Sequence, residues 1–232
     1  MKRTHVLTTV AASAAAALSV AAPALAASPA VAKHGTKVSI RIEGQTKTLR
    51  TAETITTKAG SFTRRGQKVA NDTVLGALNV ATTGRWTGTW YPTYSEWFVT
   101  GILGQTPSSK AKQTWSLYVN GVYSSSGVGA TVKPGEKLLF AVTSYAGSTP
   151  LVSNLVAPST GTAGKAFTVK LQDYTAKGRL VALKGATVSY GAKRVKVRGS
   201  SVRITPVKAG KLTVTVSKRG YVRDEATVTV TR

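Results

Sequence analysis

The stretch WSLYVNGVY, residues 115–123, decides the fold of the first part of the chain. Residues 115–119 predict one strand, and residues 122–123 begin the next. Asn120-Gly121 stands between them and is the strongest short-range signal for a hairpin, because a type I′ turn needs positive φ at both central residues. Trp115 belongs to the alternating strand, so we expect it in the core.

Further strands are predicted on both sides of this hairpin, with a single convincing helix before it. Asp72 is the expected N-cap of that helix, since its carboxylate can accept the free amide protons at a helix start. Apolar residues continue from there at helical spacing for about three turns. The strands are predicted at residues 37–42, which alternate polar and apolar side chains, and at 53–57, 97–103 and 138–142.

These segments together resemble the transcobalamin C-terminal-like family of uncharacterised bacterial secreted domains. The matching segments are residues 73–78 (TVLGAL), 99–104, 115–121, 127–129 and 132–138. The resemblance covers residues 36–145 and implies a β-grasp-like domain, in which a small sheet wraps one helix. In transcobalamins this domain is one lid of a clamp, and a helical barrel forms the other part. The rest of this chain is too short and strand-like for that barrel, and no residue is carried over as a cobalamin contact.

The second part of the chain predicts only short strands, punctuated by glycines. Such spacing is typical of a β-sandwich. Residues 209–222 also resemble the end of bacterial immunoglobulin-like domains, where a glycine turn leads into an alternating strand. The strands are expected at residues 166–171, 179–183, 187–190, 194–197, 201–204, 211–216 and 226–230.

The N-terminus is typical of a secretory signal peptide. Lys2 and Arg3 precede an apolar, alanine-rich run, and ALA at 24–26 supplies the small residues of a cleavage site. Cleavage would lower the formal net charge from +24 to +22. We expect a secreted monomer that can associate with the cell wall and has no integral membrane segment. The expected division is a signal peptide at 1–26, a flexible start at 27–35, a β-grasp-like domain at 36–145, a linker at 146–152 and an immunoglobulin-like β-sandwich at 153–232.

The sequence supports no catalytic site. It contains no Cys, and His34 is the single histidine beyond the signal peptide. Asp224 and Glu225 are neighbours on a strand and point to opposite faces, whereas Glu43 and Glu53 flank a turn and could meet. Ordinary surface charge remains the simpler interpretation of that pair. We expect no enzyme activity, no metal site and no cofactor.

Aromatic residues concentrate between positions 86 and 98. The early part of this run contains Gly84, Gly88 and Pro92, which predict a loop. Aromatic rings on a loop can stack on sugar rings or another apolar face, and they are costly to expose without use. Alternatively, they cover the open face of the small sheet. The candidate ligand-binding residues are Trp86, Trp90, Tyr91 and Tyr94.

Basic residues concentrate in the second part of the chain. Alternation places Arg194, Lys196 and Arg198 on one side of a strand, and Lys218 and Arg219 could extend the same face. Such a face attracts polyanions, although it can also serve solubility alone. For a secreted protein we expect anionic wall polymers or glycans as partners, and no nucleic acid.

The function predicted from these features is a secreted, non-enzymatic binding or adhesion protein that associates electrostatically with the anionic cell envelope. The alternative is an extracellular protein that binds a small ligand, a glycan or a corrinoid, with the aromatic loop. A hydrolase built on Ser or Thr and Lys is a third alternative.

Overall fold

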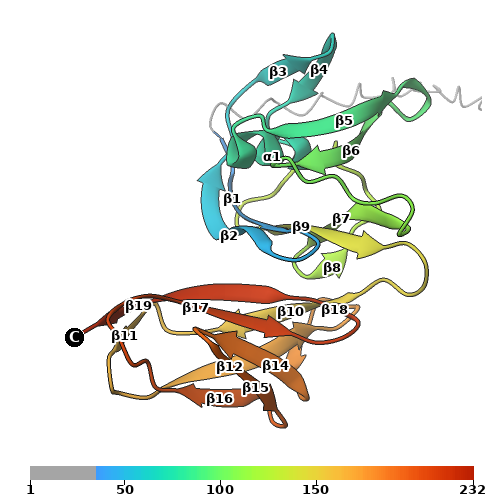
Figure 1. Ribbon diagram of the computed structural model, residues 1–232. Helices are drawn as coiled ribbons and strands as arrows, with labels where there is room; N and C mark the ends of the chain where they lie inside the picture. The colour runs from blue at the N-terminus through green and yellow to red at the C-terminus, as the bar shows by residue number, and fades with distance from the viewer. Residues whose placement is uncertain (1–34) are drawn as a thin grey trace, which may run out of the picture. The chain divides into compact units, whose positions relative to one another are not determined.

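The computed structural model describes residues 35–232, which lie within one compact unit (Figure 1). The predicted signal peptide at 1–26, and residues 27–34 of the predicted flexible start, lie outside the described residues. The predicted fold class is confirmed. The described chain is mainly β, its one α-helix is α1 (Val74–Thr82), and the strands form separate sheets in a β-grasp part and a sandwich part.

The β-grasp part is organised by a five-stranded sheet with the order β2-β1-β9-β7-β8. The central strands β1 and β9 are parallel, while the pairs β1–β2 and β7–β9 are antiparallel. A parallel central pair with α1 in the connection is the β-grasp topology. The strands are β1 (Lys37–Glu43), β2 (Thr48–Thr56), β7 (Gln113–Val119), β8 (Val122–Tyr123) and β9 (Lys137–Ser144).

One face of this sheet forms the first hydrophobic core. Val38, Ile40 and Ile42 of β1 pack there with residues of α1. The alternation of polar and apolar residues predicted a strand with one buried face. That prediction is wrong at the end of β1, where both faces are buried. Arg41 and Glu43 on the other face are also buried, because side chains of the sandwich part cover them.

The N-cap of α1 lies one residue after the predicted one. Thr73 is the N-cap, and its hydroxyl accepts a hydrogen bond from the Gly76 amide at 3.1 Å. Asp72 therefore precedes the cap, and the helix has nine residues, somewhat less than the three turns expected. Gly76 is needed for packing, since a Cβ there would lie 2.2 Å from the Asn71 carbonyl oxygen.

Two hairpins complete the β-grasp part, β3 (Ser61–Arg64) with β4 (Gln67–Ala70) and β5 (Trp86–Tyr91) with β6 (Glu96–Ile102). Both lie on the α1 side of the sheet in Figure 1. The turn η1 (Pro92–Tyr94) joins β5 to β6. The loop predicted around Gly88 is wrong because this glycine lies within β5. A Cβ at Gly88 would approach the rings of Trp86 and Trp97 to 3.2 Å, so the glycine makes room for two indoles.

The sandwich part consists of two five-stranded sheets. One sheet has the order β11-β19-β17-β14-β15, in which β11 is parallel to β19 and the other pairs are antiparallel. Its strands are β11 (Thr160–Thr162), β14 (Ala186–Tyr190), β15 (Lys193–Val197), β17 (Gly210–Ser217) and β19 (Asp224–Thr231). The other sheet contains β10 (Leu151–Val156), β12 (Phe167–Tyr174), β13 (Leu180–Ala182), β16 (Ser201–Ile204) and β18 (Tyr221–Val222).

The sandwich has its own hydrophobic core, and a third, smaller cluster joins the two parts. Tyr118 and Leu139 of the β-grasp sheet pack there against Val152, Tyr174 and Val222 of the sandwich. The Tyr118 hydroxyl donates a hydrogen bond to the Pro150 carbonyl oxygen at 3.0 Å. Residues 145–150 connect β9 to β10.

Candidate functional site

An aromatic groove lies between β6 and the strands β7 and β8. It is formed by two hollows of about 480 and 580 Å³, called here hollow A and hollow B. Both are lined by Phe98, Val99, Thr114 and Trp115, so the two hollows adjoin along β6 and β7, and together they are called the groove. Hollow A continues toward β8, and hollow B continues toward the start of β7.

Every exposed aromatic side chain among residues 35–232 lines this groove. The exposed fractions are 47% for Tyr91, 78% for Tyr94, 50% for Phe98, 50% for Tyr123 and 60% for Tyr145. The first four line hollow A, and Tyr145 lines hollow B with Phe98. Aromatic rings exposed in one place are typical of a surface that binds a ligand or partner.

The floor of the groove contains two buried indoles. Trp97 and Trp115 are 4% and 8% exposed and both line hollow A. Neither indole N–H has a hydrogen-bond partner within the described chain. Both indole nitrogens are themselves buried, so the two tryptophans contribute ring surface rather than accessible hydrogen-bond donors to the groove.

Glu96 fixes one wall of hollow A. Its carboxylate accepts hydrogen bonds from the Gly129 amide at 2.9 Å and from the Trp97 amide at 3.2 Å. A Cβ at Gly127 or Gly129 would come within 3 Å of this carboxylate. The Gly-Val-Gly segment at 127–129 therefore lets the backbone approach Glu96, and Val128 fills the core beside it.

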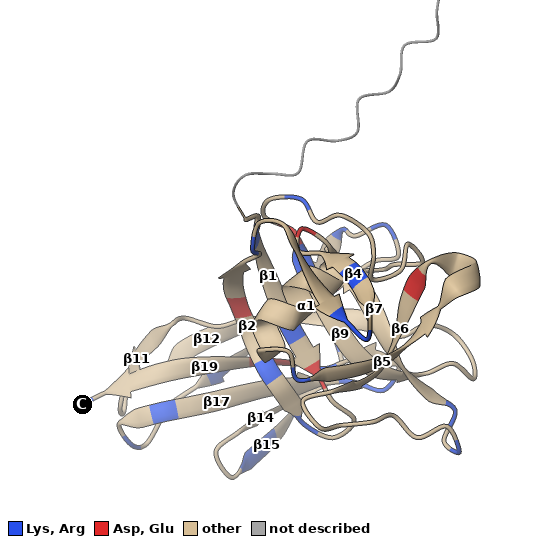
Figure 2. Ribbon diagram, turned by 90° about the horizontal axis from the view of Figure 1, so that it is seen from above, with Lys and Arg blue, Asp and Glu red and all other residues tan. Residues whose placement is uncertain are grey.

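The groove carries little charge although the chain is strongly basic. No Lys or Arg lines hollow A or hollow B, and Glu96 is the one acidic residue that does. The basic residues lie elsewhere, for example on β15 and β17, which carry blue segments in Figure 2. The chemistry of the groove therefore favours an uncharged ligand with an apolar face.

The structure separates the four aromatic residues proposed from the sequence. Tyr91 and Tyr94 line the groove, whereas Trp86 is 2% exposed and belongs to the core. The Trp86 indole donates a hydrogen bond to the Asn79 side chain at 2.9 Å, and the Arg64 guanidinium lies 4.0 Å from its ring centroid. Trp90 is partly buried against the core, with its ring 5.8 Å from that of Trp97.

Four further aromatic residues of the groove were not predicted as binding residues from the sequence. Trp97 and Phe98 were within the aromatic run but assigned only to a strand, and Tyr123 and Tyr145 lie far along the chain. Trp115 is buried as predicted, although it also lines the groove. The one sequence signal for Tyr123 is the Asn120-Gly121 turn that ends two positions before it and pairs it with Tyr118.

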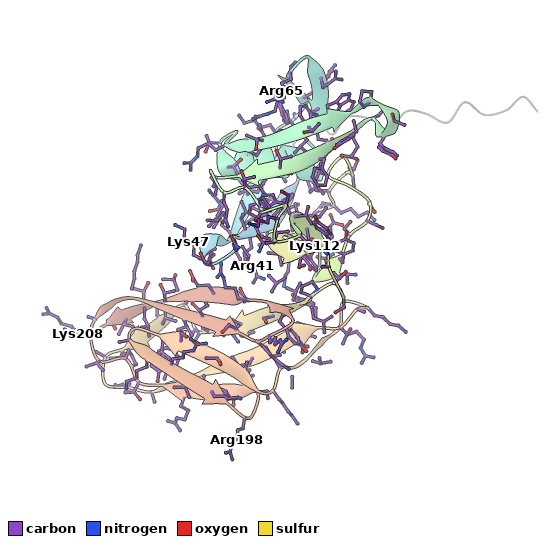
Figure 3. The ribbon with its side chains drawn as sticks, turned by 45° about the vertical axis from the view of Figure 1, so that its right-hand side comes forward. Arg41, Lys47, Arg65, Lys112, Arg198 and Lys208 are labelled. Atoms are coloured by element: carbon purple, nitrogen blue, oxygen red, sulfur yellow. The ribbon has the colours of Figure 1, made fainter. Side chains whose placement is uncertain are left out.

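The predicted basic residues lie on two segments of the sandwich. Arg194 and Lys196 are on one face of β15, opposite the buried Val197. Arg198 follows β15 and extends away from the sandwich in Figure 3. Lys218 and Arg219 lie in the turn after β17. Strands β15 and β17 both pair with β14. The Lys218 ammonium is 4.6 Å from the Tyr221 ring centroid.

The acidic pairs considered from the sequence do not form carboxylate dyads. Glu43 accepts a hydrogen bond from Arg223 at 2.9 Å, and Arg41, labelled in Figure 3, pairs with Asp224. Glu53 instead accepts a hydrogen bond from Arg50 at 2.7 Å, and both residues lie on β2. Burial raises the pKa of the Glu43 carboxyl above its ordinary value, and the attraction of the two nearby guanidinium groups offsets this only in part.

A cavity of about 420 Å³ lies beside this ionic group, between β1, β9, β10 and β19. Of its four charged lining residues, Arg41 and Asp224 are paired with each other, and Lys137 and Glu225 are the other two. No exposed aromatic side chain lines this cavity, in contrast to the aromatic groove. Among residues 35–232, no cluster of three His, Cys, Asp or Glu residues has the geometry to hold a metal ion. None of the helices in that range is long and apolar enough to span a membrane.

Comparison with known families gives one match. Residues 71–144, less than half of the chain, match the family described as "Domain of unknown function (DUF4430)". The match lies within residues 36–145, for which the sequence predicted a transcobalamin C-terminal-like domain. The finer assignments, to that family and to bacterial immunoglobulin-like domains, stay predictions. None of the curated proteins matches the sequence.

Solved structures share low identity with this chain. A protein from Ruminococcus gnavus ATCC 29149, described provisionally as metal binding, is 12% identical with a TM-score of 0.34, over 47% of this chain and 97% of its own. Haptocorrin in complex with Cbi is 18% identical with a TM-score of 0.36, over 49% of this chain and 26% of its own. Immunoglobulin domains 1–4 of Sidekick-1 are 13% identical with a TM-score of 0.23, over 85% of this chain and 51% of their own.

Proposed function

We propose that the protein is a non-enzymatic binding protein that takes an uncharged ligand in its aromatic groove. The observation that carries this proposal is the gathering of all five exposed aromatic side chains of residues 35–232 along hollows A and B. The ligand classes suggested by this chemistry are a glycan and a corrinoid, because each presents an apolar face and hydrogen-bonding groups.

Exposed aromatic rings lose contact with water when a ligand covers them. Burial of apolar surface contributes roughly 25 cal/mol per Å², and a pocket of roughly 300–1,000 Å³ is the usual size for a small-ligand site. Each hollow falls within this range at about 480 and 580 Å³.

The test is a titration of the purified protein with chitohexaose, cellohexaose and cyanocobalamin in which tryptophan fluorescence is the measured signal. Trp97 and Trp115 line hollow A, so a ligand there should change their emission. We expect saturable binding of at least one of the three compounds, and weaker binding to the Phe98→Ala variant. Absence of binding by all three compounds would refute the proposal.

We propose as a second function that the protein is secreted and attaches to anionic envelope polymers through the sandwich. The supporting observation is that Arg194 and Lys196 lie on one face of the edge strand β15, with Arg198 directly after it. Attraction between such a face and a polyanion releases counterions and weakens as salt rises.

Co-sedimentation with purified cell walls over a salt series tests this second function. We expect binding at low salt that decreases as salt increases and that is reduced in the Arg194→Ala/Lys196→Ala double variant. A Lys208→Ala variant is the matched control, because Lys208 is an exposed cation away from β15 (Figure 3). Equal sedimentation of both variants would contradict the role of the β15 face.

A further inference from the structure

The groove is longer than one compact ligand requires. Hollows A and B share Phe98 and Trp115 and follow β7 from Gln113 to Leu117. Four residue steps along a strand correspond to roughly 13 Å. Each hollow also has an exposed ring of its own, Tyr94 in A and Tyr145 in B. The groove therefore has two aromatic binding positions with Phe98 at their junction.

The polar groups beside these rings are uncharged except for Glu96. Hollow B is lined by the hydroxyl and amide side chains of Thr100, Thr106, Ser109 and Gln113. In hollow A, Ser124 and Ser125 supply the lining hydroxyl groups. Glu96 is engaged with backbone amides, and no Lys or Arg lines either hollow.

Aromatic rings next to hydroxyl and amide groups suit a ligand with alternating apolar faces and hydroxyl edges. A sugar ring has this chemistry, because its C–H face can stack on an aromatic ring while its hydroxyls form hydrogen bonds. The lack of cations argues against a polyanionic chain. A compact ligand would occupy one hollow and leave the other aromatic position uncovered.

We propose that the groove binds a linear, uncharged glycan, with sugar units in both hollow A and hollow B. This inference rests on the proposed function, since it names the ligand class of the same groove. It adds that affinity depends on the length of the glycan, because a short oligosaccharide reaches only one of the two aromatic positions.

Isothermal titration calorimetry with chitobiose, chitohexaose, cellobiose and cellohexaose tests the proposal. For one of the two sugar series we expect the hexasaccharide to bind at least about tenfold more tightly than the disaccharide. Tyr94→Ala and Tyr145→Ala should each weaken hexasaccharide binding by about fivefold to tenfold. Only one of the two variants should weaken disaccharide binding.

Matched controls separate ring stacking from damage to the fold. Tyr94→Phe and Tyr145→Phe keep the rings and should bind nearly as the unchanged protein does. Val207→Ala alters an exposed apolar residue outside the groove and should have no effect. Equal affinity for the disaccharide and hexasaccharide, or full hexasaccharide binding by Tyr145→Ala, overturns the two-position proposal while the proposed function stands. Binding of cyanocobalamin but of no glycan also overturns the two-position proposal. If the unchanged protein binds none of these compounds, both that proposal and the proposed function are overturned.

Discussion

Replacing Tyr94 by alanine should weaken ligand binding without weakening the fold. Tyr94 ends the η1 turn, is 78% exposed and lines hollow A. If a ligand covers one face of its ring, roughly 55 Å² of apolar surface leaves water, a fraction of what a whole aromatic side chain buries. At roughly 25 cal/mol per Å² this is about 1.4 kcal/mol, or a tenfold rise in Kd.

The assay compares Kd and the free energy of unfolding for the same variant. Tyr94 has few contacts to lose, so the free energy of unfolding in urea should change by less than about 0.5 kcal/mol. Tyr94→Phe should retain most of the affinity, and Val207→Ala should retain all of it. An unchanged Kd for Tyr94→Ala, measured with the oligosaccharide that the protein binds, would refute the reasoning that the exposed rings form the binding surface.

The remaining predictions concern the junction between the two parts of the chain. Asp224→Asn should lower the free energy of unfolding by about 2 kcal/mol, because it removes the nearer of the two carboxylates that pair with the buried Arg41 guanidinium and leaves only Glu43 at 3.6 Å. A urea titration measures this, and a loss below about 1 kcal/mol contradicts it. Burial raises the pKa of Glu43 in the folded protein above its unfolded pKa of 4.5. The stability that this carboxyl contributes is therefore complete below pH 4.5 and is lost as the pH rises through the folded pKa. The unfolding free energy of the unchanged protein minus that of Glu43→Gln should therefore decrease from about pH 4 to about pH 7, and a constant or rising difference would count against this. Gly121→Ala would place a Cβ 2.1 Å from the Tyr174 ring, so it should destabilise more than Gly135→Ala, which has a similar φ and nothing within 4 Å; equal thermal shifts for the two variants would show the contact to be unimportant.

Local patterns predicted much of the fold because the sheets follow short-range rules. The Asn120-Gly121 turn fixed the β7–β8 hairpin, and alternation identified most strands of the sandwich. The β5 strand was missed because Gly88 and Pro92 are typical of loops. In the structure Gly88 serves packing between two indoles, which local sequence does not reveal.

The candidate site was predicted only in part because its residues are distant in sequence. Tyr91 and Tyr94 belong to the aromatic run, but the other rings of hollow A and hollow B include Tyr123 and Tyr145, which the β-grasp topology brings beside them. The burial of Trp86 also depends on packing against α1 and the β3–β4 hairpin. No periodicity in the sequence carries this information.

The ionic group at the junction was unpredictable for the same reason. Arg41 was assigned to the half-buried strand at 37–42, Glu43 was expected to flank a turn, and Asp224 was considered only beside its neighbour Glu225. Their partners lie about 180 positions away, as the Arg223–Glu43 hydrogen bond shows. Pairing at this separation depends on how the β-grasp and sandwich parts pack.

Binding of an uncharged ligand by the aromatic rings of the groove is tested by a fluorescence titration of the purified protein with chitohexaose and cellohexaose in low and high salt. Because no Lys or Arg lines the groove, we expect saturable binding of one of these glycans with the same Kd at both salt concentrations. Failure of both neutral glycans to bind, or a Kd that rises steeply with salt, would contradict it.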